Sequence, residues 1–416
     1  MMNKALQVLI DRGFYQNCTD LDALSDLMDK GPVKFYIGVD PTGPSLHIGH
    51  MVPIFASHHL QQQGHCPIIL VGGGTAMIGD PSGKTEMRKM LTPEQIKDNC
   101  KHIKNQLGQV VDFSLDPTDG KGKAILRNNA DWLTNLNYIS FLREIGKYFS
   151  VNKMLTFESY KQRLEKGLSF IEFNYQLLQS YDFLTLYRQE NCRLQIGGGD
   201  QWGNIVAGTD LIRRTESAEC YGLTFNLITR ADGKKMGKSE QGAVFLDPDM
   251  YSTYNYYQYW RNVNDSDVIK FMKLFTFLSL DEIAEYEDPK RNINEAKERL
   301  AYEQTLITHG LEEAEKAKAT AKAMFSKGGV GNIEAMPSIE IDPSVIKDRI
   351  LTIDLFAMTD LCKTKSDARR LIKDGGAYLA NEKVEGFDST VGLDAFKDGE
   401  LIIRAGKKRH FRIILK

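Results

Sequence analysis

Two histidines three positions apart, His47 and His50, are the first candidates for chemistry, and they lie in the stretch "DPTGPSLHIGHM". The stretch follows a β-branched run, "VKFYIGVD", and leads into a helix-like run, "MVPIFASHHLQQQG", which predicts a turn from a strand into a helix. Free backbone N–H groups at such a helix start favour phosphate, imidazoles can add donors, and Gly49 would let a base or ribose approach closely. The alternatives are a zinc site completed by His65 and Cys66, or a loop with two solvated histidines.

Two further segments carry cations among glycines. "GDPSGKT" resembles a P-loop but has three residues instead of four between its glycines, so it fails that motif, and Lys84 and Arg88 remain candidates for a phosphate clamp. "ADGKKMGKSEQG" contains Lys235 and Lys238 and has no apolar periodicity. We expect this lysine loop to close on a pyrophosphate leaving group; the alternative is a solvated loop.

Polar residues also share one face of a predicted helix, "SFIEFNYQLLQSYDFL". Tyr175, Gln179 and Asp182 occupy positions i, i+4 and i+7, which favours a polar pocket over an exposed stripe, since the latter more often carries Lys and Glu. After another strand, "QIGGGDQWGN" supplies Gly198 and Asp200, and a carboxylate there suits a ribose hydroxyl pair.

The elements that must position these residues alternate between strands and helices over the first 230 residues. The candidate strands are "VKFYIGVD", "PIILVGGG", "KAILRN", "RLQIGG" and "LTFNLIT", and the candidate helices are Pro93–Leu107, Tyr138–Phe149, Ser169–Gln189 and Gln201–Arg214. This alternation predicts an α/β fold with a Rossmann-like, mostly parallel sheet, whose ligands bind at the carboxyl ends of the strands. The N-terminal run "MMNKALQVLIDRGFYQN" is predicted to be a helix and not a targeting segment.

From about Asp247 the strand signals stop and three long runs predict a helical region. "SKGGVGNIEAMPSIEIDPS" is then a predicted linker because it is rich in glycine, proline and serine. The remainder, from about Ile350, is predicted to be a small α+β unit with a helix in "KSDARRLIKDGG" and a basic hairpin in "ELIIRAGKKRHFRIIL".

Bulk composition excludes several classes of protein. The chain has 416 residues and a formal net charge of −2, so a nucleic-acid surface must be local. Its 6 cysteines form no C-x-x-C pair, which argues against a disulfide framework or structural zinc and favours a reducing cytoplasm. No apolar run approaches the length that spans a membrane.

Taken together, these segments resemble the bacterial-type tyrosyl-tRNA synthetases, which are class I enzymes. "HIGH" at 47–50 matches one class motif, and "KMGKS" at 235–239 matches the other, usually written KMSKS, with Gly237 in place of its first serine. "YIGVDPTGPSLHIGH", "VGGGTAMIGDPSGKTEMR", "SFIEFNYQLLQSYDF" and "LQIGGGDQWGN" look like tyrosyl-specific segments, and the tail resembles an S4-type RNA-binding domain. Gly199 departs from the common GGSDQW, although Asp200 and Gln201 keep their places.

The resemblance implies an enzyme that joins L-tyrosine to the α-phosphate of ATP, releases pyrophosphate, and transfers the tyrosyl group to the 3′ end of tRNA(Tyr). It also implies Mg²⁺ on the phosphates, a homodimer, and tRNA contacts through the helical and C-terminal domains. Its domains would be a Rossmann-like catalytic domain (1–230), a KMSKS-type loop with a helical anticodon-binding domain (231–330), a linker (331–349) and an S4-like domain (350–416).

The resemblance assigns roles to three groups of residues. The residues that would contact ATP are Thr42, His47, Gly49, His50, Gly198, Asp200 and Lys238. Those that would stabilise the departing pyrophosphate are Lys84, Arg88, Lys235, Lys238 and Ser239. Those that would form the tyrosine site are Tyr36, Asp40, Asp80, Tyr175, Gln179, Asp182 and Gln201. Within the last group, Asp80, Tyr175 and Gln179 would bind the ammonium, while Tyr36 and Asp182 would bind the phenol hydroxyl.

Two other functions remain open. The chain could be a paralogue that binds RNA and no longer charges tRNA, which the intact histidine and lysine motifs disfavour. It could also activate tryptophan, which Tyr36 and Asp182 disfavour because both suit a hydroxyl group.

Overall fold

The computed structural model describes residues 1–82, 91–114, 122–228, 236, 238–239, 242–325, 336–380, 382–406 and 409–416; at 238, 239, 324 and 325 it describes only the backbone. By internal contacts the chain divides into two compact units, one made of Met1–Tyr251 and Tyr259–Thr308, the other of Ser252–Gln258 and His309–Lys416. The four domain ranges expected from the sequence stay a prediction.

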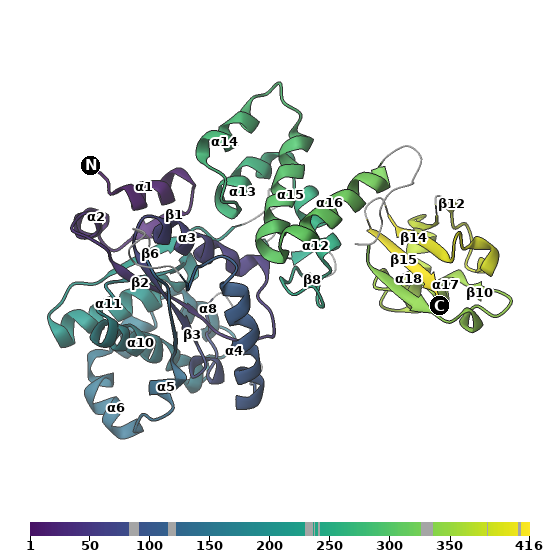
Figure 1. Cartoon of the computed structure of the whole chain (residues 1–416). Coiled ribbons are helices and arrows are strands. Elements are labelled where there is room, and N and C mark those ends of the chain that lie inside the picture. The colour runs from purple at the N-terminus through teal and green to yellow at the C-terminus, as the bar shows by residue number, and fades with distance from the viewer. Residues whose placement is uncertain are drawn as a thin grey trace. The chain divides into compact units, whose positions relative to one another are not determined.

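A six-stranded sheet forms the centre of the first unit (Figure 1). Its strands lie in the order β1-β6-β5-β2-β3-β4, with β1 Tyr15–Cys18, β2 Lys34–Val39, β3 Cys66–Val71, β4 Ile125–Asn128, β5 Leu194–Gly198 and β6 Tyr221–Phe225. Strands β2 to β6 run parallel, and β1 pairs antiparallel with β6. The predicted parallel α/β sheet is therefore confirmed.

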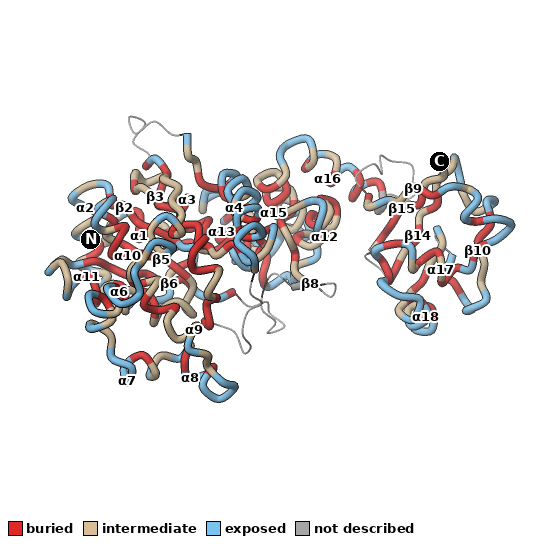
Figure 2. The backbone as a smooth tube through the Cα atoms, turned by 90° about the horizontal axis from the view of Figure 1, so that it is seen from below, coloured by how far each residue is buried: buried red, intermediate tan, exposed pale blue. Residues whose placement is uncertain are grey.

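Helices cover both faces of this sheet. The connection from β2 to β3 runs through α3 (Met51–Gln62), whereas α10 (Tyr175–Glu190) and α11 (Trp202–Glu216) precede and follow β5. The connection from β2 to β3 runs toward the β4 edge of the sheet, whereas the connections through α10 and α11 run toward the β1 edge. Because such crossovers are right-handed, α3 lies on the opposite face from α10 and α11. Figure 2 shows buried backbone through the strands and exposed residues on outer helices such as α2 (Leu21–Asp29) and α4 (Pro93–Leu107).

The strand order reverses between β2 and β5, which are direct neighbours. In doubly wound sheets the connections leave such a pair toward opposite faces, and this opens a crevice at the carboxyl ends of the two strands. Val39 and Gly198 end these strands here. The segments predicted to bind ligand, after Val39 and around Gly198, therefore meet at one place.

Several predicted helices differ from the observed ones in their ends. Only α4 has the predicted bounds, because Thr92 and Gln95 form a capping box and Pro93 takes the first helical position. The run expected at Ser169–Gln189 divides at Asn174 into α9 (Phe170–Phe173) and α10, and the run at Tyr138–Phe149 forms α6 (Tyr138–Glu144) followed by a 3₁₀ turn. Short helices α5, α7 and α8 span Ala130–Leu133, Val151–Met154 and Glu158–Leu164.

The N-terminal run is only partly the helix that its sequence predicts. Helix α1 (Lys4–Asp11) ends before Gly13, which has a φ of 85°, and Tyr15–Cys18 then forms the edge strand β1. A positive φ suits glycine and stops a helix. The strand expected in "LTFNLIT" likewise ends at Phe225.

Five helices follow the sheet: α12 Thr253–Arg261, α13 Val268–Phe275, α14 Leu280–Ala284, α15 Ile293–His309 and α16 Leu311–Phe325. The last two form one continuous predicted run, which Gly310 interrupts with a φ of 87°. Across the described residues, no helix is both long and apolar enough to span a membrane.

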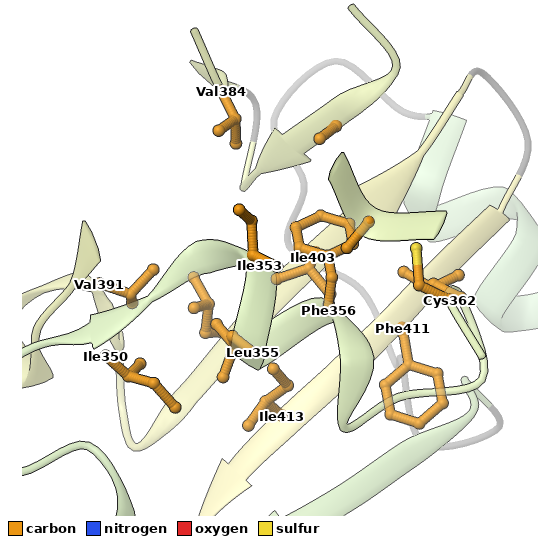
Figure 3. Close-up of a cluster of buried hydrophobic side chains, with 14 of the residues drawn as sticks. Ile350, Ile353, Leu355, Phe356, Cys362, Val384, Val391, Ile403, Phe411 and Ile413 are labelled. Atoms are coloured by element: carbon orange, nitrogen blue, oxygen red, sulfur yellow. The ribbon is translucent and has the colours of Figure 1, made fainter. Parts of the chain in front are cut away.

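The second unit contains a sheet in the order β12-β11-β14-β15-β9, with β9 Ser338–Ile341, β11 Ala377–Leu379, β12 Glu382–Lys383, β14 Glu400–Ala405 and β15 Arg409–Leu415. Helices α17 (Thr352–Ala357) and α18 (Lys365–Lys373) and a small pair, β10 (Ile350–Leu351) with β13 (Thr390–Val391), belong to the same unit, as do α16 and most of α12. The hairpin and helix expected here are confirmed. Figure 3 shows the core of this unit, with Ile353, Phe356 and Ile403 among its buried side chains.

One part of the predicted linker is wrong. Ser338–Ile341 forms β9, which pairs in parallel with β15 from Arg412 to Leu415. Its alternating Ser-Ile-Glu-Ile pattern is typical of an edge strand, but the glycines and prolines around it hide the signal. The C-terminal fold therefore includes residues that precede Ile350.

Candidate active site

Asp40, directly after β2, joins two elements at the crevice. Its Oδ1 accepts a hydrogen bond from Thr75 Oγ1 (2.7 Å), and its Oδ2 accepts one from Tyr175 Oη (2.8 Å). The backbone of Gly72 packs closely against the Asp40 carboxylate, since a Cβ added at Gly72 would lie 1.9 Å from Asp40 Oδ1. The end of β2, the turn after β3 and helix α10 thus converge on one carboxylate.

Asp182 lies deeper on the same helix and is 2% exposed. Asn129 Nδ2 donates to its Oδ2 (2.9 Å), and Trp132 Nε1 donates to its Oδ1 (2.8 Å). Burial raises the pKa of Asp182 to about 8, although both N–H donors act in the opposite direction. The direction of this shift favours the neutral carboxyl, which suits a neutral hydroxyl partner.

Tyr36 faces this same region from β2. It is 1% exposed, its ring centroid lies 5.2 Å from that of Phe183, and burial, with the neighbouring Asp182, raises its pKa well above the usual value. Among the described residues, nothing forms a hydrogen bond with its Oη. A buried hydroxyl that lacks a protein partner is costly, so it marks a place where a ligand group can bind.

A second polar network surrounds Asp80. Its Oδ2 accepts from Gln201 Nε2 (2.7 Å) and its Oδ1 from the backbone N–H of Ser82 (2.9 Å). Gln179 Nε2 donates to Gln201 Oε1 (3.2 Å), and Asn204 Nδ2 donates to Gln179 Oε1 (2.9 Å). The loop after β3 is thereby tied to α10 and α11, and the amide side chains are held in fixed orientations.

Tyr175 lies between the two networks, and the negative field around it suits a cation. Its pKa is raised well above the usual value, first by burial and then by Asp40 and Asp80. The i, i+4, i+7 face predicted from the sequence is confirmed, since Tyr175, Gln179 and Asp182 all bond into the crevice. The neighbouring carboxylates Asp40 and Asp80 suit an ammonium group, while Tyr36 and Asp182 suit a hydroxyl group.

The histidine motif forms a 3₁₀ turn at Ile48–His50 that leads into α3. The rings of His47 and His50 stack with centroids 3.8 Å apart. His47 Nδ1 accepts the N–H of Gly49 (3.1 Å), and His50 Nδ1 accepts the N–H of His47 (3.2 Å). Because each Nδ1 accepts, each neutral ring carries its proton on Nε2 and can donate it to an anion.

Backbone bonding in this turn corrects one expectation. The N–H of Ile48 donates to Val244 O (3.1 Å) and that of His50 to His47 O (2.8 Å), so the backbone donors of His47–His50 are all used within the protein. The imidazoles, rather than free N–H groups, are the donors here. His65, which the zinc alternative would need, accepts the N–H of Val33 at its Nδ1 (3.1 Å), and in the described ranges no group of three His, Cys, Asp or Glu could hold a metal.

The two class motifs adjoin one another. A Cβ at Gly49 would meet His47 Cε1 at 2.8 Å and the carbonyl oxygen of Met236 at 3.5 Å, so Gly49 leaves room between the histidine turn and the "KMGKS" segment. His47 also forms an isolated antiparallel β-bridge with Phe245, just beyond that segment. Of the remaining motif residues, Lys84, Arg88 and Lys235 lie outside the described residues, and for Lys238 and Ser239 only the backbone is described, as the short strand β7 paired with β8 (Gly242–Ala243).

The predicted ribose residues follow β5. Gly198 and Asp200 are partly exposed, and an added Cβ at Gly198 would lie 2.7 Å from Asp200 Oδ1. Thr42, exposed in the loop after β2, donates its N–H to Asp40 O (2.8 Å). All described residues of the predicted site therefore follow β2 or β5, or lie on elements that pack against those strand ends.

Sequence reasoning missed four side chains: Thr75, Asn129, Trp132 and Asn204. Thr75 and Asn129 connect Asp40 to Asp182, since Asn129 Nδ2 also donates to Thr75 Oγ1 (2.9 Å). A signal for Asn129 was present, because polar residues at the carboxyl end of a predicted parallel strand belong to the binding edge. Trp132 and Asn204 carried no comparable signal.

The sheet order places this chain among the doubly wound α/β proteins. A family described as class I tRNA synthetases (W and Y) matches residues 28–326, which is more than half of the sequence. The chain belongs to this family. It is 58% identical over 414 residues to the tyrosine–tRNA ligase of Treponema denticola, covering 99% of this chain and 100% of the relative. It is 51% identical over 415 residues to that of Acetivibrio thermocellus, covering 100% of both.

Solved structures agree with this family. A C-terminally truncated mitochondrial tyrosyl-tRNA synthetase from Aspergillus nidulans matches with a TM-score of 0.67 at 30% identity, over 77% of this chain and 94% of that one. A tryptophanyl-tRNA synthetase from Encephalitozoon cuniculi shares the fold alone, with a TM-score of 0.55 at 14% identity over 74% of this chain and 87% of that one.

Proposed function

We infer that this chain is a tyrosine–tRNA ligase that activates L-tyrosine with ATP and transfers it to tRNA(Tyr). The observation that carries this inference is a crevice with a polar group for each end of tyrosine. Asp80, Tyr175 and Gln179 suit the ammonium, and Tyr36 and Asp182 suit the phenol hydroxyl. Full-length relatives that are tyrosine–tRNA ligases support the same substrate.

In the first step a carboxylate oxygen of tyrosine forms a bond to the α-phosphorus of ATP, and the bond to pyrophosphate breaks. The attacking carboxylate is ionised at neutral pH, so this step needs no general base. The protein contributes position and charge stabilisation. In the second step the terminal hydroxyl of tRNA attacks the tyrosyl carbonyl, and AMP leaves.

ATP would bind across the switch point. His47 and His50 would donate from Nε2 to phosphate oxygens, with Thr42 and Gly49 beside them, while Gly198 and Asp200 would hold the ribose. We assign stabilisation of the departing pyrophosphate to Lys84, Arg88, Lys235, Lys238 and Ser239. Mg²⁺ would arrive on the triphosphate, since Mg²⁺ commonly binds through substrate phosphates with few protein ligands.

We further propose that the second unit carries an S4-like tRNA-binding surface, with the helices before it contributing to tRNA contact. Lys363, Lys365, Arg369, Arg370 and Lys373 are exposed around α18, whose Ala368 and Ile372 are buried in the core. An exposed row of cations on a packed helix suits phosphate contact, whose affinity falls as salt rises.

The test of this division is a deletion placed before β9. Removing residues 336–416, rather than 350–416, avoids leaving β9 without its partner β15. Tyrosine-dependent ATP–pyrophosphate exchange should persist in the folded truncation, while charging of tRNA is lost. A truncated chain that still charges tRNA at the full rate contradicts the tRNA role of this unit.

A homodimer is the proposed assembly. Within a stretch of 32 residues, four large apolar side chains are exposed, and a second copy would cover them: Ile139 (70%), Val151 (55%), Leu164 (48%) and Phe170 (70%). Sedimentation should give a dimer for the unmodified chain and a monomer for Phe170→Asp, with Leu393→Asp in the other unit as control. A monomeric unmodified chain contradicts the proposal. The six free cysteines agree with the cytoplasm as the proposed location.

The ligase activity itself is tested by charging purified tRNA(Tyr) with radiolabelled tyrosine, using Asp80→Asn as a variant with a weakened ammonium site. We expect charging by the full chain and a raised KM for tyrosine in the variant, because an amide attracts an ammonium less than a carboxylate does. A full chain that binds tRNA but forms no tyrosyl-tRNA would instead support the paralogue without catalytic activity.

A further inference from the structure

Gln16 is the extra residue of a β-bulge at the edge of the main sheet. Tyr15 pairs with Phe225 and Asn17 pairs with Thr224, so Gln16 has no partner position on β6. A bulge turns one side chain out of the regular alternation and is common beside active sites. Phe225 pairs in turn with Gly198 on β5, so the bulge lies level with the strand end that carries the proposed ribose site.

The Gln16 side chain reaches past β6 and covers Gly199. A Cβ added at Gly199 would lie 2.1 Å from Gln16 Oε1 and 2.8 Å from both Cδ and Nε2. The amide of Gln16 therefore occupies the space that a side chain at 199 would fill. Gly199 is not among the glycines with a positive φ, so its backbone would accept a side chain, and the three nearest atoms that oppose one all belong to Gln16.

The covered residue starts the short turn Gly199–Gln201, which carries Asp200. On the preceding residue, Gly198, the space of a Cβ is limited by Asp200 Oδ1 at 2.7 Å and by Leu227 Cδ2 at 3.3 Å. Leu227 is 54% exposed. Gln16 thus limits the space beside Gly199, and Asp200 with Leu227 limits the space beside the preceding Gly198.

We propose that Gln16 is a positioning residue for ribose recognition: its amide packs on Gly199 and fixes the turn that presents Asp200 to the sugar hydroxyls of ATP. Gln16 and Gly199 then act as one unit, in which the glycine makes room for the glutamine. This inference rests on the proposed function, because it takes ATP as the ligand at Gly198 and Asp200.

The test uses Gln16→Ala, Gly199→Ser and the double variant in the full chain. Asn17→Ala is the control, since Asn17 is the next residue of the same strand and is exposed like Gln16. Tyrosine-dependent ATP–pyrophosphate exchange gives KM for ATP, 2′-deoxyATP and tyrosine. Gln16→Ala should raise KM for ATP by about three- to tenfold, the range of one hydrogen bond, and change KM for 2′-deoxyATP less. KM for tyrosine and the melting temperature should not change.

Gly199→Ser should produce the same change, because the serine side chain displaces the Gln16 amide. The double variant should be no worse than either single variant, and this non-additivity is the signature of residues that act as a unit. Additive effects, equal changes for ATP and 2′-deoxyATP, or an unchanged KM for ATP would each overturn the inference while leaving the ligase intact. An unmodified chain without tyrosine-dependent exchange would overturn the proposed function and this inference together.

Discussion

Replacing Tyr36 by phenylalanine should stabilise the free protein and weaken its selection of tyrosine. The side chain is 1% exposed, and its Oη has no hydrogen-bond partner among the described residues. A buried hydroxyl without a partner costs about 1–3 kcal/mol, so Tyr36→Phe should raise the free energy of unfolding by about 1 kcal/mol. The ring and its contact with Phe183 stay in place.

Catalysis should change in the opposite direction. A tyrosine hydroxyl bound between Tyr36 and Asp182 would lose one of its two partners, which is worth about 0.5–1.5 kcal/mol, or about two- to tenfold in binding. The ratio of kcat/KM for tyrosine over phenylalanine should narrow by that factor, because phenylalanine has no hydroxyl to lose a partner. Asp182 keeps the remainder of the selectivity.

Urea unfolding without substrates and pyrophosphate exchange with each amino acid measure the two effects. Tyr160→Phe is a matched control, because Tyr160 is also 1% exposed but its Oη donates to Phe173 O (2.9 Å). The free energy of unfolding of Tyr160→Phe should fall by about 1 kcal/mol, since the substitution leaves the carbonyl of Phe173 with one hydrogen-bond partner fewer. If Tyr36→Phe is destabilised as much as Tyr160→Phe, or leaves the selectivity ratio unchanged, the assignment of Tyr36 to the phenol hydroxyl is wrong.

Three further predictions concern the same site. Because the pKa of Asp182 is raised to about 8, against about 4 in the unfolded chain, the folded state holds a proton that the unfolded state releases. The stability that this proton contributes is complete below about pH 4 and is lost as the pH rises through 8. Urea unfolding at pH 5 and 7 should therefore show that the free energy of unfolding of the wild type falls by about 1.4 kcal/mol per pH unit relative to that of Asp182→Asn. If the free energies of unfolding of the two proteins change equally with pH, the pKa of Asp182 is not raised. Gly72→Ala should reduce tyrosine activation by at least about tenfold, because the new Cβ would lie 1.9 Å from Asp40 Oδ1, whereas Gly108→Ala, with 3.4 Å to its nearest atom, should act as wild type. Lys238→Ala should slow adenylate formation in single turnovers and leave the dissociation constant of tyrosine unchanged, since a loop lysine would bind pyrophosphate chiefly in the transition state; the reverse result would make it a ground-state binding residue.

The sequence predicted best those features whose pattern is local. The i, i+4, i+7 spacing on α10 and the strand that leads into Asp40 could be derived from periodicity, and the observed contacts agree. The predicted bounds of α4 also agree with the structure, in which a capping box at Thr92 and Gln95 defines its start. Such signals act within one turn of a helix or along one strand, so tertiary contacts do not override them.

Features that depend on distant segments were not predicted. Asn129 and Trp132 bind Asp182 from 53 and 50 positions away, and nothing in their own neighbourhood indicates that partner. Strands β1 and β9 are short edge strands whose partners lie in β6 and β15, so pairing rather than local sequence decides their structure. The backbone bond from Ile48 to Val244 was missed for the same reason, whereas the other backbone donors of His47–His50 bond within the turn itself.

The central claim is that the crevice between β2 and β5 selects tyrosine at both ends. ATP–pyrophosphate exchange with tyrosine, phenylalanine and tryptophan, measured for the wild type and for Asp182→Ala, tests it most directly. The wild type should exchange strongly with tyrosine alone, and Asp182→Ala should lose that exchange, because Asp182 is the buried carboxyl that Asn129 and Trp132 hold in place. Two results would contradict selection of tyrosine by this crevice. One is wild-type exchange with tryptophan that is as strong as with tyrosine, and the other is undiminished exchange with tyrosine in Asp182→Ala.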